Sequence, residues 1–269
     1  MIDVRVPVGT TPATAGSAAP AHVEVPIPQY SARKILAVWA SAALPMGALA
    51  WIAAPVLAGI TGGPSALPRA LFVMITLGLA WQFGLTVILV YREQRTLRWS
   101  VIREVLWLRA PRSPKTGHRG GRMWLAVPLL MVLFVAAAKI PALPHPAIRD
   151  AGAFLASPAG HALLHGSWGW FALIAILSIF NTVLGEELLF RGLLLPRMNR
   201  AFGRRDWLAN ALLFTGYHLQ GPWVMSYVLP LGLILAYPSK RYRSSLIGIA
   251  VHSSQTVLIM AIALALVLK

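Results

Sequence analysis

The stretch of residues 168–191 reads WGWFALIAILSIFNTVLGEELLFR. Its first 18 residues carry no charge, and a helix of about 20 apolar residues spans the hydrocarbon core of a bilayer. Two adjacent acids, Glu186 and Glu187, follow directly, and Arg191 stands one helical turn further on. Ionisable residues inside a membrane helix are energetically costly and usually functional. This stretch therefore predicts both a membrane fold and a functional site.

The composition of the whole chain agrees with a protein that is dissolved in lipid. Of its 269 residues, 57% are hydrophobic and 12% are charged, which is about half the charged fraction of a soluble domain. The chain has no cysteine, so disulfide frameworks, cysteine-ligated zinc and thiol nucleophiles are excluded. A net charge of +16 suggests nucleic acid binding in a soluble protein. Here we expect no nucleic acid partner, because membrane topology accounts for the basic residues.

Seven stretches are candidates for crossing the membrane. The sequence predicts an all-α, polytopic transmembrane helical bundle of about seven, at most eight, helices. Residues 1–34 hold no sustained apolar run and are expected to form a disordered tail, followed by a transmembrane domain over residues 35–269. A basic cytoplasmic loop is expected over residues 91–122. The expected spans are residues 35–60, 70–91, 123–138, 168–184, 207–219, 223–237 and 244–268.

The distribution of basic residues predicts the orientation. With the N-terminus in the cytoplasm, 20 of the 24 Lys and Arg residues fall on the inner side of the membrane and 4 on the outer side. Basic residues concentrate in cytoplasmic loops. We therefore expect a multi-pass protein of the cell membrane with a cytoplasmic N-terminus, whose basic residues meet anionic lipid head groups.

Two histidines, His218 and His252, lie at a predicted depth similar to that of Glu186. At about 1.5 Å per residue, all three lie roughly 10–16 Å below the cytoplasmic surface. Glu187 and Arg191 are four residues apart, share a helix face and form a favourable acid-before-base pair. Glu186 lies about 100° away around the helix axis, so it is free to point toward the histidines.

This combination of side chains suits hydrolysis. A carboxylate beside an imidazole can hold a water molecule and deprotonate it for attack on a carbonyl group. A second imidazole can stabilise the oxyanion that forms. The same residues, Glu186, His218 and His252, are also a familiar zinc ligand set with an open position for water. We favour peptide hydrolysis by an activated water with no required cofactor, and bound zinc is the alternative.

The motifs resemble those of the CPBP intramembrane proteases, a family that includes the type II CAAX prenyl proteases and bacteriocin-processing membrane proteins. Its EExxxR motif is matched by Glu186, Glu187 and Arg191, and its FxxxH motif by Phe214 and His218. Its third motif, a late histidine followed four residues later by asparagine, is matched at His252, with threonine at position 256. These motifs place the family-like core at about residues 168–268.

The resemblance implies a role for each matched residue. Glu186 would be the general base, His218 its partner on the water, and His252 a group on the oxyanion side. Glu187 and Arg191 would be a supporting ion pair. Thr256 would support the oxyanion in place of the asparagine, through a hydroxyl of shorter reach.

Three functions are consistent with the sequence. The favoured one is an intramembrane endopeptidase, glutamate-type or metal-dependent, acting on a membrane-associated or lipid-modified, CAAX-like peptide. The first alternative is a proton-coupled transporter that uses the same glutamate and histidines, although no internal repeat supports it. The second is a catalytically inactive immunity or scaffold protein of the membrane.

Overall fold

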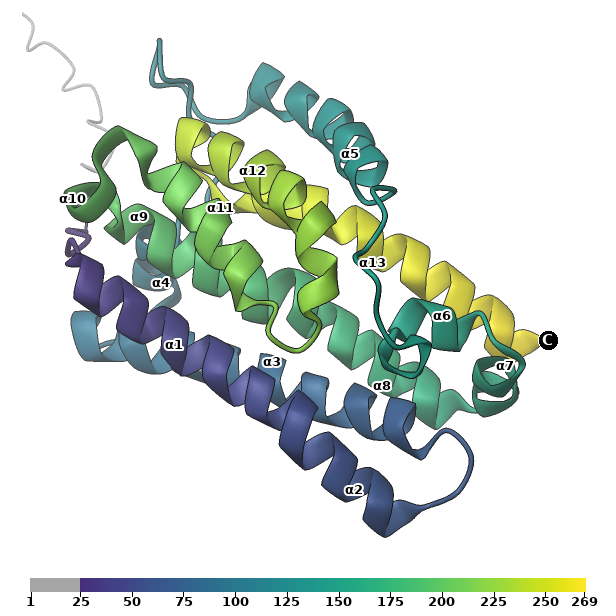
Figure 1. Ribbon diagram of the computed structural model, residues 1–269. Helices are drawn as coiled ribbons and strands as arrows, with labels where there is room; N and C mark the ends of the chain where they lie inside the picture. Colours follow the sequence, from purple (N-terminus) through teal and green to yellow (C-terminus); the bar gives the residue numbers. More distant parts are fainter. Residues whose placement is uncertain (1–24) are drawn as a thin grey trace, which may run out of the picture.

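The computed structural model describes residues 25–269, and this part of the chain is helical, with no β-strand. The prediction of an all-α bundle is confirmed. Figure 1 shows the long helices running side by side along one direction, with the C-terminus at the end of α13. The α-helices are α1 (Ala32–Ala48), α2 (Ala54–Thr61), α3 (Ala66–Gln94), α4 (Trp99–Val105), α5 (Ala126–Ala137), α6 (Ala151–Leu155), α7 (Pro158–Leu164), α8 (Trp168–Ile179), α9 (Leu195–Arg197), α10 (Asn199–Phe202), α11 (Asp206–Tyr217), α12 (Met225–Tyr242) and α13 (Ser245–Leu268).

Four continuous helical stretches of the described chain are long and apolar enough to cross a membrane: Ala32–Thr61, Ala66–Gln94, Trp168–Arg197 and Ser245–Leu268. The third stretch is longer than the predicted span because the helix continues through both glutamates. This stretch ends at Arg197. The chain is therefore a multi-pass membrane protein.

The other three predicted spans are not among these four stretches. The third predicted span forms an apolar helix over Gly121–Ala137, which is shorter than a usual span. Helix α11 has 12 residues, or about 18 Å, against a hydrocarbon core of about 30 Å. Helices α11 and α12 pack as a hairpin whose turn stops part of the way along the bundle, whereas α8 and α13 continue further (Figure 1). The predicted fifth span therefore forms the shorter arm of this hairpin, α11, and the predicted sixth span lies in the longer arm, α12, which has 18 residues.

The segment before α1 is ordered, which corrects part of the predicted tail. The Tyr30 amide donates to the Arg197 carbonyl at 2.9 Å, and the Tyr30 side chain is buried and hydrogen-bonded to Glu93. Helix α1 begins at Ala32, where Ser31 accepts a hydrogen bond from the Lys34 amide. The prediction of disorder is thus wrong for residues 25–34, because these long-range contacts give no signal in local composition. Residues 1–24 lie outside the described part.

The predicted basic loop is largely folded. Helix α3 extends to Gln94 and α4 forms within the loop. Leu106 and Trp107 are buried, and their carbonyls accept hydrogen bonds from the Ser245 hydroxyl at 2.8 Å and the Ser245 amide at 2.9 Å. The loop therefore fixes the beginning of α13, which carries His252.

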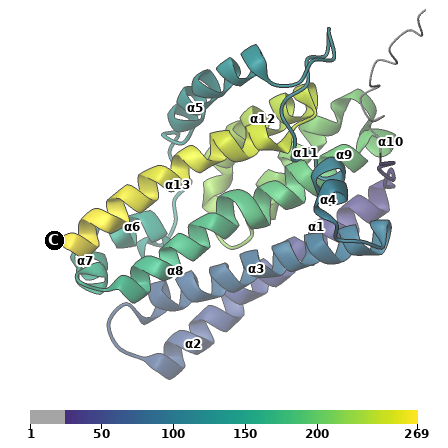
Figure 2. The same cartoon turned by 180° about the vertical axis from the view of Figure 1, so that it is seen from behind.

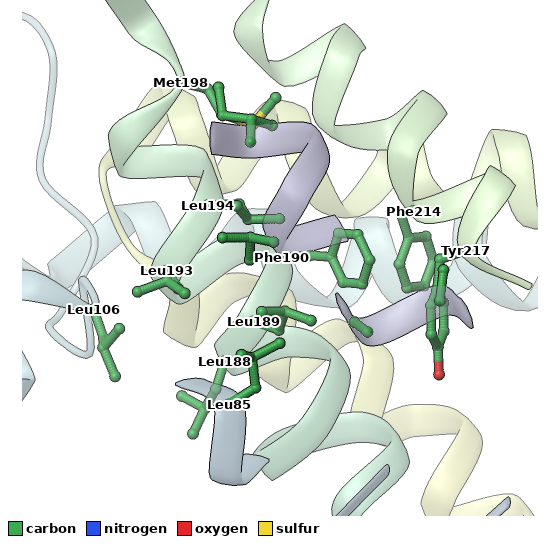
Figure 3. Close-up of a cluster of buried hydrophobic side chains, with 14 of the residues drawn as sticks. Leu85, Leu106, Leu188, Leu189, Phe190, Leu193, Leu194, Met198, Phe214 and Tyr217 are labelled. Atoms are coloured by element: carbon green, nitrogen blue, oxygen red, sulfur yellow. The ribbon is translucent and has the colours of Figure 1, made fainter. Parts of the chain in front are cut away.

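The largest hydrophobic core surrounds residues 188–198 of the third spanning helix. Figure 3 shows the leucines of this segment stacked along the helix and its aromatic ring facing α11. The Phe190 ring lies 5.1 Å from Phe214 and 5.5 Å from Tyr217, both in edge-on or tilted contact. This packing fixes the third spanning helix against α11, and so places Glu186 opposite the end of α11, where His218 lies.

Candidate active site

The two glutamates lie between widened turns of the third spanning helix. The flanking segments η4 (Phe180–Gly185) and η5 (Leu188–Leu194) are π-helical. Such i→i+5 turns are rare, and those within α-helices are frequently found at functional sites. A regular 3.6-residue pattern does not reveal them, so sequence analysis did not predict this feature.

Glu187 is the centre of a buried charged cluster. Its Oε1 atom lies 2.9 Å from Arg191 Nη1 and 3.1 Å from His252 Nδ1. Glu187 and Arg191 are fully buried, and His252 is 4% exposed. Arg191 also donates to the Gly232 carbonyl at 3.4 Å. The predicted Glu187–Arg191 pair is therefore present, and the structure joins His252 to this pair.

Glu186 faces His218. Glu186 Oε1 lies 4.0 Å from His218 Nε2, and the glutamate is 2% exposed. His218 Nδ1 lies 2.9 Å from the Phe214 carbonyl oxygen. A carbonyl oxygen only accepts hydrogen bonds, so Nδ1 carries a proton. In the neutral ring, Nε2 is then an acceptor that points toward the carboxylate.

Glu186 differs from the other acidic side chains of residues 25–269. Its nearest basic partner is the His218 ring at 4.0 Å. Each of the others lies against a basic side chain within hydrogen-bonding distance. These pairs are Glu93–Arg197, Glu104–Arg109, Asp150–His145, Glu187–Arg191 and Asp206–Lys240.

Phe214 separates and supports the two histidines. Its ring centroid lies 5.0 Å from the His218 ring and 6.4 Å from the His252 ring, with both pairs edge-on. The Arg191 guanidinium lies 4.1 Å from the same centroid. Figure 3 shows this ring between Phe190 and Tyr217. The phenylalanine of the FxxxH motif therefore forms the wall between the two predicted halves of the site.

Two further groups of residues shape the site and were missed in the sequence. A Cβ atom at Gly248 would lie 2.3 Å from Glu187 Oε2, so only glycine leaves room for this carboxylate. Gly248 lies one helical turn before His252. A small residue at this spacing was the sequence signal that could have indicated a side chain packed against this face of the helix. Tyr217, next to His218, is hydrogen-bonded through its hydroxyl to the buried Gln82 of α3. No sequence signal connected Gln82 with a residue so distant along the chain.

Thr256 does not face the cluster with a free hydroxyl. Its Oγ1 lies 2.8 Å from Thr182 Oγ1, and Thr182 donates to the Ser178 carbonyl at 2.9 Å. Since a hydroxyl has one hydrogen, Thr182 accepts from Thr256 and the Thr256 proton is used. The structure thus pairs Thr256 with the third spanning helix.

A metal centre would need several ligand side chains that converge on one point. Across residues 25–269 there is no group of three or more His, Cys, Asp or Glu side chains placed to hold a metal ion. His252 uses Nδ1 to contact Glu187, while Glu186 faces His218. Among residues 25–269, Glu186, His218 and His252, which are the alternative zinc set, are therefore not grouped as metal ligands.

A comparison with known families places this site in context. Residues 167–258 match the family model described as type II CAAX prenyl endopeptidase Rce1-like. No curated protein and no solved structure matches the chain. The matched segment contains every motif residue from Glu186 to Thr256. The match thus supports the resemblance to the CPBP proteases, and it covers residues 167–258, about a third of the chain.

Proposed function

We propose that this protein is an intramembrane endopeptidase in which Glu186 and His218 activate a water molecule. The observation that carries the proposal is the pairing of Glu186, a buried carboxylate without a cationic partner at hydrogen-bonding distance, with the acceptor nitrogen of His218 at 4.0 Å. A separation of 4.0 Å is too long for a direct hydrogen bond. It is suited to one bridging water, whose oxygen would lie about 2.8 Å from each acceptor.

The two acceptors determine how the water would be oriented. One water hydrogen points to Glu186 Oε1 and the other to His218 Nε2, which leaves an oxygen lone pair free to attack. In the proposed reaction the water oxygen bonds to the scissile carbonyl carbon while Glu186 takes its proton. Glu186 then transfers this proton to the leaving nitrogen as the C–N bond breaks. One water is consumed, and one carboxyl and one amino group are formed.

His252 would act on the oxyanion, held in place by Glu187 and Arg191. The His252 Nδ1–H group donates to Glu187, so Nε2 is the ring atom left for the substrate. In the imidazolium form of the ring, this nitrogen donates a hydrogen bond to the oxyanion. An imidazole oriented by a carboxylate is the arrangement known from hydrolytic triads. Glu187 and Arg191 are positioning residues in this scheme.

The proposed substrate is a peptide tethered to the membrane, with a lipid-modified, CAAX-like C-terminal segment as the favoured class. This choice rests on the family match and on the position of the site inside the bundle. Membrane lipid is the second partner. We also propose that the end of the bundle formed by α4, α9 and α10 faces the cytoplasm, because Arg197, Arg200, Arg204 and Arg205 gather at or next to it.

The test is cleavage of a farnesylated peptide by the purified protein in phospholipid vesicles. Glu186→Gln keeps the shape of the side chain and removes the base, so cleavage should fall by at least about 10³-fold. Its matched control is Asp150→Asn, the same loss of charge at a partly exposed carboxylate outside the site, which should leave the rate within about threefold. Equal cleavage by wild type and Glu186→Gln would remove Glu186 as the base. Proton flux without proteolysis, lost in the same variant, would favour the transporter alternative.

A further inference from the structure

A basic cavity lies at the end of the bundle that we assign to the cytoplasm. It has a volume of about 360 Å³ and lies between the loop that joins α4 to α5 and the last turn of α12. Its walls are formed by Arg112, Ser113, Pro114, Gly117, Arg241 and Arg243. A neighbouring cavity is lined by both Arg243 and Asn199 of α10, so the two lie at the same end of the bundle. Half of the lining residues carry a guanidinium group and none carries a carboxylate, so the cavity is electropositive.

The two walls of this cavity are joined by backbone hydrogen bonds. The Arg112 amide donates to the Tyr242 carbonyl at 2.8 Å, which ties the loop to α12. Within the loop, the Ser113 amide donates to the His118 carbonyl at 2.8 Å. Figures 1 and 2 show the loop between α4 and α5 projecting beside the end of α12. The loop and the helix end therefore present the arginines from two connected backbones.

The charges of Arg241 and Arg243 are not neutralised by the part of the chain that the structure describes. Both residues are exposed, and neither forms an ion pair with any of residues 25–269. The acids on neighbouring elements, Glu104 and Asp206, are each paired with another basic side chain. Like charges that line one cavity repel each other, and an anion bound between them relieves this repulsion.

The backbone of Arg243 adopts a conformation that is unusual for an arginine. It caps α12 in the left-handed region, with φ of +48° and ψ of +49°. Glycine is the usual residue at such a helix end, because a Cβ atom crowds the backbone in this conformation. Residues held in sparsely populated conformations cluster where ligands are bound. The arginine therefore costs backbone stability and places a guanidinium group on the cavity wall.

We propose that this cavity is a binding site for a phosphate group. Phosphate oxygens point in several directions, so they can accept hydrogen bonds from the loop and from the helix end together. The planar guanidinium groups match this geometry, because each donates two parallel hydrogen bonds. A carboxylate has two oxygens in one plane, and a single guanidinium satisfies it. The Ser113 hydroxyl accepts from the Thr116 amide at 3.2 Å, and its hydrogen is not used in a bond within residues 25–269.

Two sources supply a phosphate group at this position. One is the phosphomonoester head group of an anionic lipid, since basic cavities on the cytoplasmic side of membrane proteins bind such head groups. The other is free phosphate in solution. Binding at this cavity is independent of peptide cleavage, because its lining includes none of Glu186, His218 and His252.

The test is calorimetric titration of the full-length protein in detergent micelles with dioctanoyl phosphatidic acid and with inorganic phosphate. Binding of both probes with similar affinity identifies free phosphate as the ligand, and binding of the lipid alone identifies a lipid head group. Binding of neither probe would overturn the site. Dioctanoyl phosphatidylcholine, whose phosphate carries a single charge beside a cation, should bind at least about tenfold more weakly than phosphatidic acid. Equal binding of the two lipids would also overturn the site.

Variants separate this cavity from the general basic surface. Arg241→Gln should weaken binding of the probe at least about tenfold, because it removes a charged donor. Arg243→Gly should weaken binding by a similar factor, while its midpoint of unfolding by sodium dodecyl sulfate stays unchanged or rises, because glycine suits the left-handed backbone. The matched control Arg204→Gln removes the same charge from an exposed position next to α10 and should change the affinity by less than about twofold. An equal loss in this control, or wild-type affinity in Arg241→Gln and Arg243→Gly, would overturn the site.

Discussion

Substitution of Gly248 by alanine tests how strictly the position of the Glu187 carboxylate is fixed. The added Cβ atom would lie 2.3 Å from Glu187 Oε2 and 3.0 Å from Ser239 Oγ, where ordinary contacts begin at 3.4 Å. The carboxylate must therefore retreat by about 1 Å. Its bonds to Arg191 and His252, at 2.9 and 3.1 Å, would both exceed the range of a hydrogen bond.

The expected cost follows from the burial of this cluster. Complete removal of one partner from a buried ion pair costs about 3–5 kcal/mol. A displaced carboxylate keeps part of the attraction, so we expect a loss of about 1–3 kcal/mol in the free energy of unfolding. Misplacement of His252 by about 1 Å should slow peptide cleavage about 10²-fold.

The assay is unfolding in mixed micelles by titration with sodium dodecyl sulfate, followed by tryptophan fluorescence, together with the cleavage rate in vesicles. The matched control is Gly84→Ala in α3, where the added Cβ would meet no atom within 4 Å. The control should change the free energy of unfolding by less than about 1 kcal/mol. A Gly248→Ala protein with the stability of the control and the wild-type cleavage rate would show that the Glu187 carboxylate does not need this fixed position.

Three further predictions concern other parts of the protein. Thr256→Val should keep the cleavage rate within about threefold, because the Thr256 hydroxyl is hydrogen-bonded to Thr182. A fall in the cleavage rate of about 10²–10³-fold would instead show that the Thr256 hydroxyl donates to the oxyanion. Arg191→Leu leaves the Glu187 carboxylate buried without its cation. It should lower the free energy of unfolding in the same micelle titration by about 3–5 kcal/mol. A loss below about 1 kcal/mol would show that the ion pair contributes little to stability. The Leu143 carbonyl and the Asp150 carboxylate raise the pKa of His145. The stabilising contribution of His145 is therefore present below the ordinary imidazole pKa and is lost as pH rises through the raised value. A nuclear magnetic resonance titration should show that this pKa falls in Asp150→Asn, and an unchanged pKa would contradict the pairing.

Much of the fold follows from local sequence. Uncharged runs of about 20 residues predict spanning helices because the hydrocarbon core demands that length. The four-residue spacing of Glu187 and Arg191 predicts their contact because i and i+4 share a helix face. The similar depth of Glu186 and His218 follows from a fixed rise per residue, and the structure places them 4.0 Å apart.

Other features depend on contacts that depth alone cannot predict. The rise per residue gives the height of His252 in the membrane but not the direction in which its ring points, so its partner Glu187 could not be predicted. Residues 207–239 carry no charge, and this composition does not distinguish a hairpin from two separate membrane spans. The contact of Phe134 with His252 joins two helices that are distant in sequence. A regular apolar pattern in each helix does not predict that these two residues meet.

In the proposed site, Glu186 and His218 act on one water molecule. The most direct measurement is the cleavage rate of the farnesylated peptide by Glu186→Gln, His218→Gln and the double variant. If the two side chains hold the same water, the double variant should be no slower than the slower single variant, because either substitution already removes the shared step. If the two losses multiply, each residue acts independently, and the account of the site is contradicted.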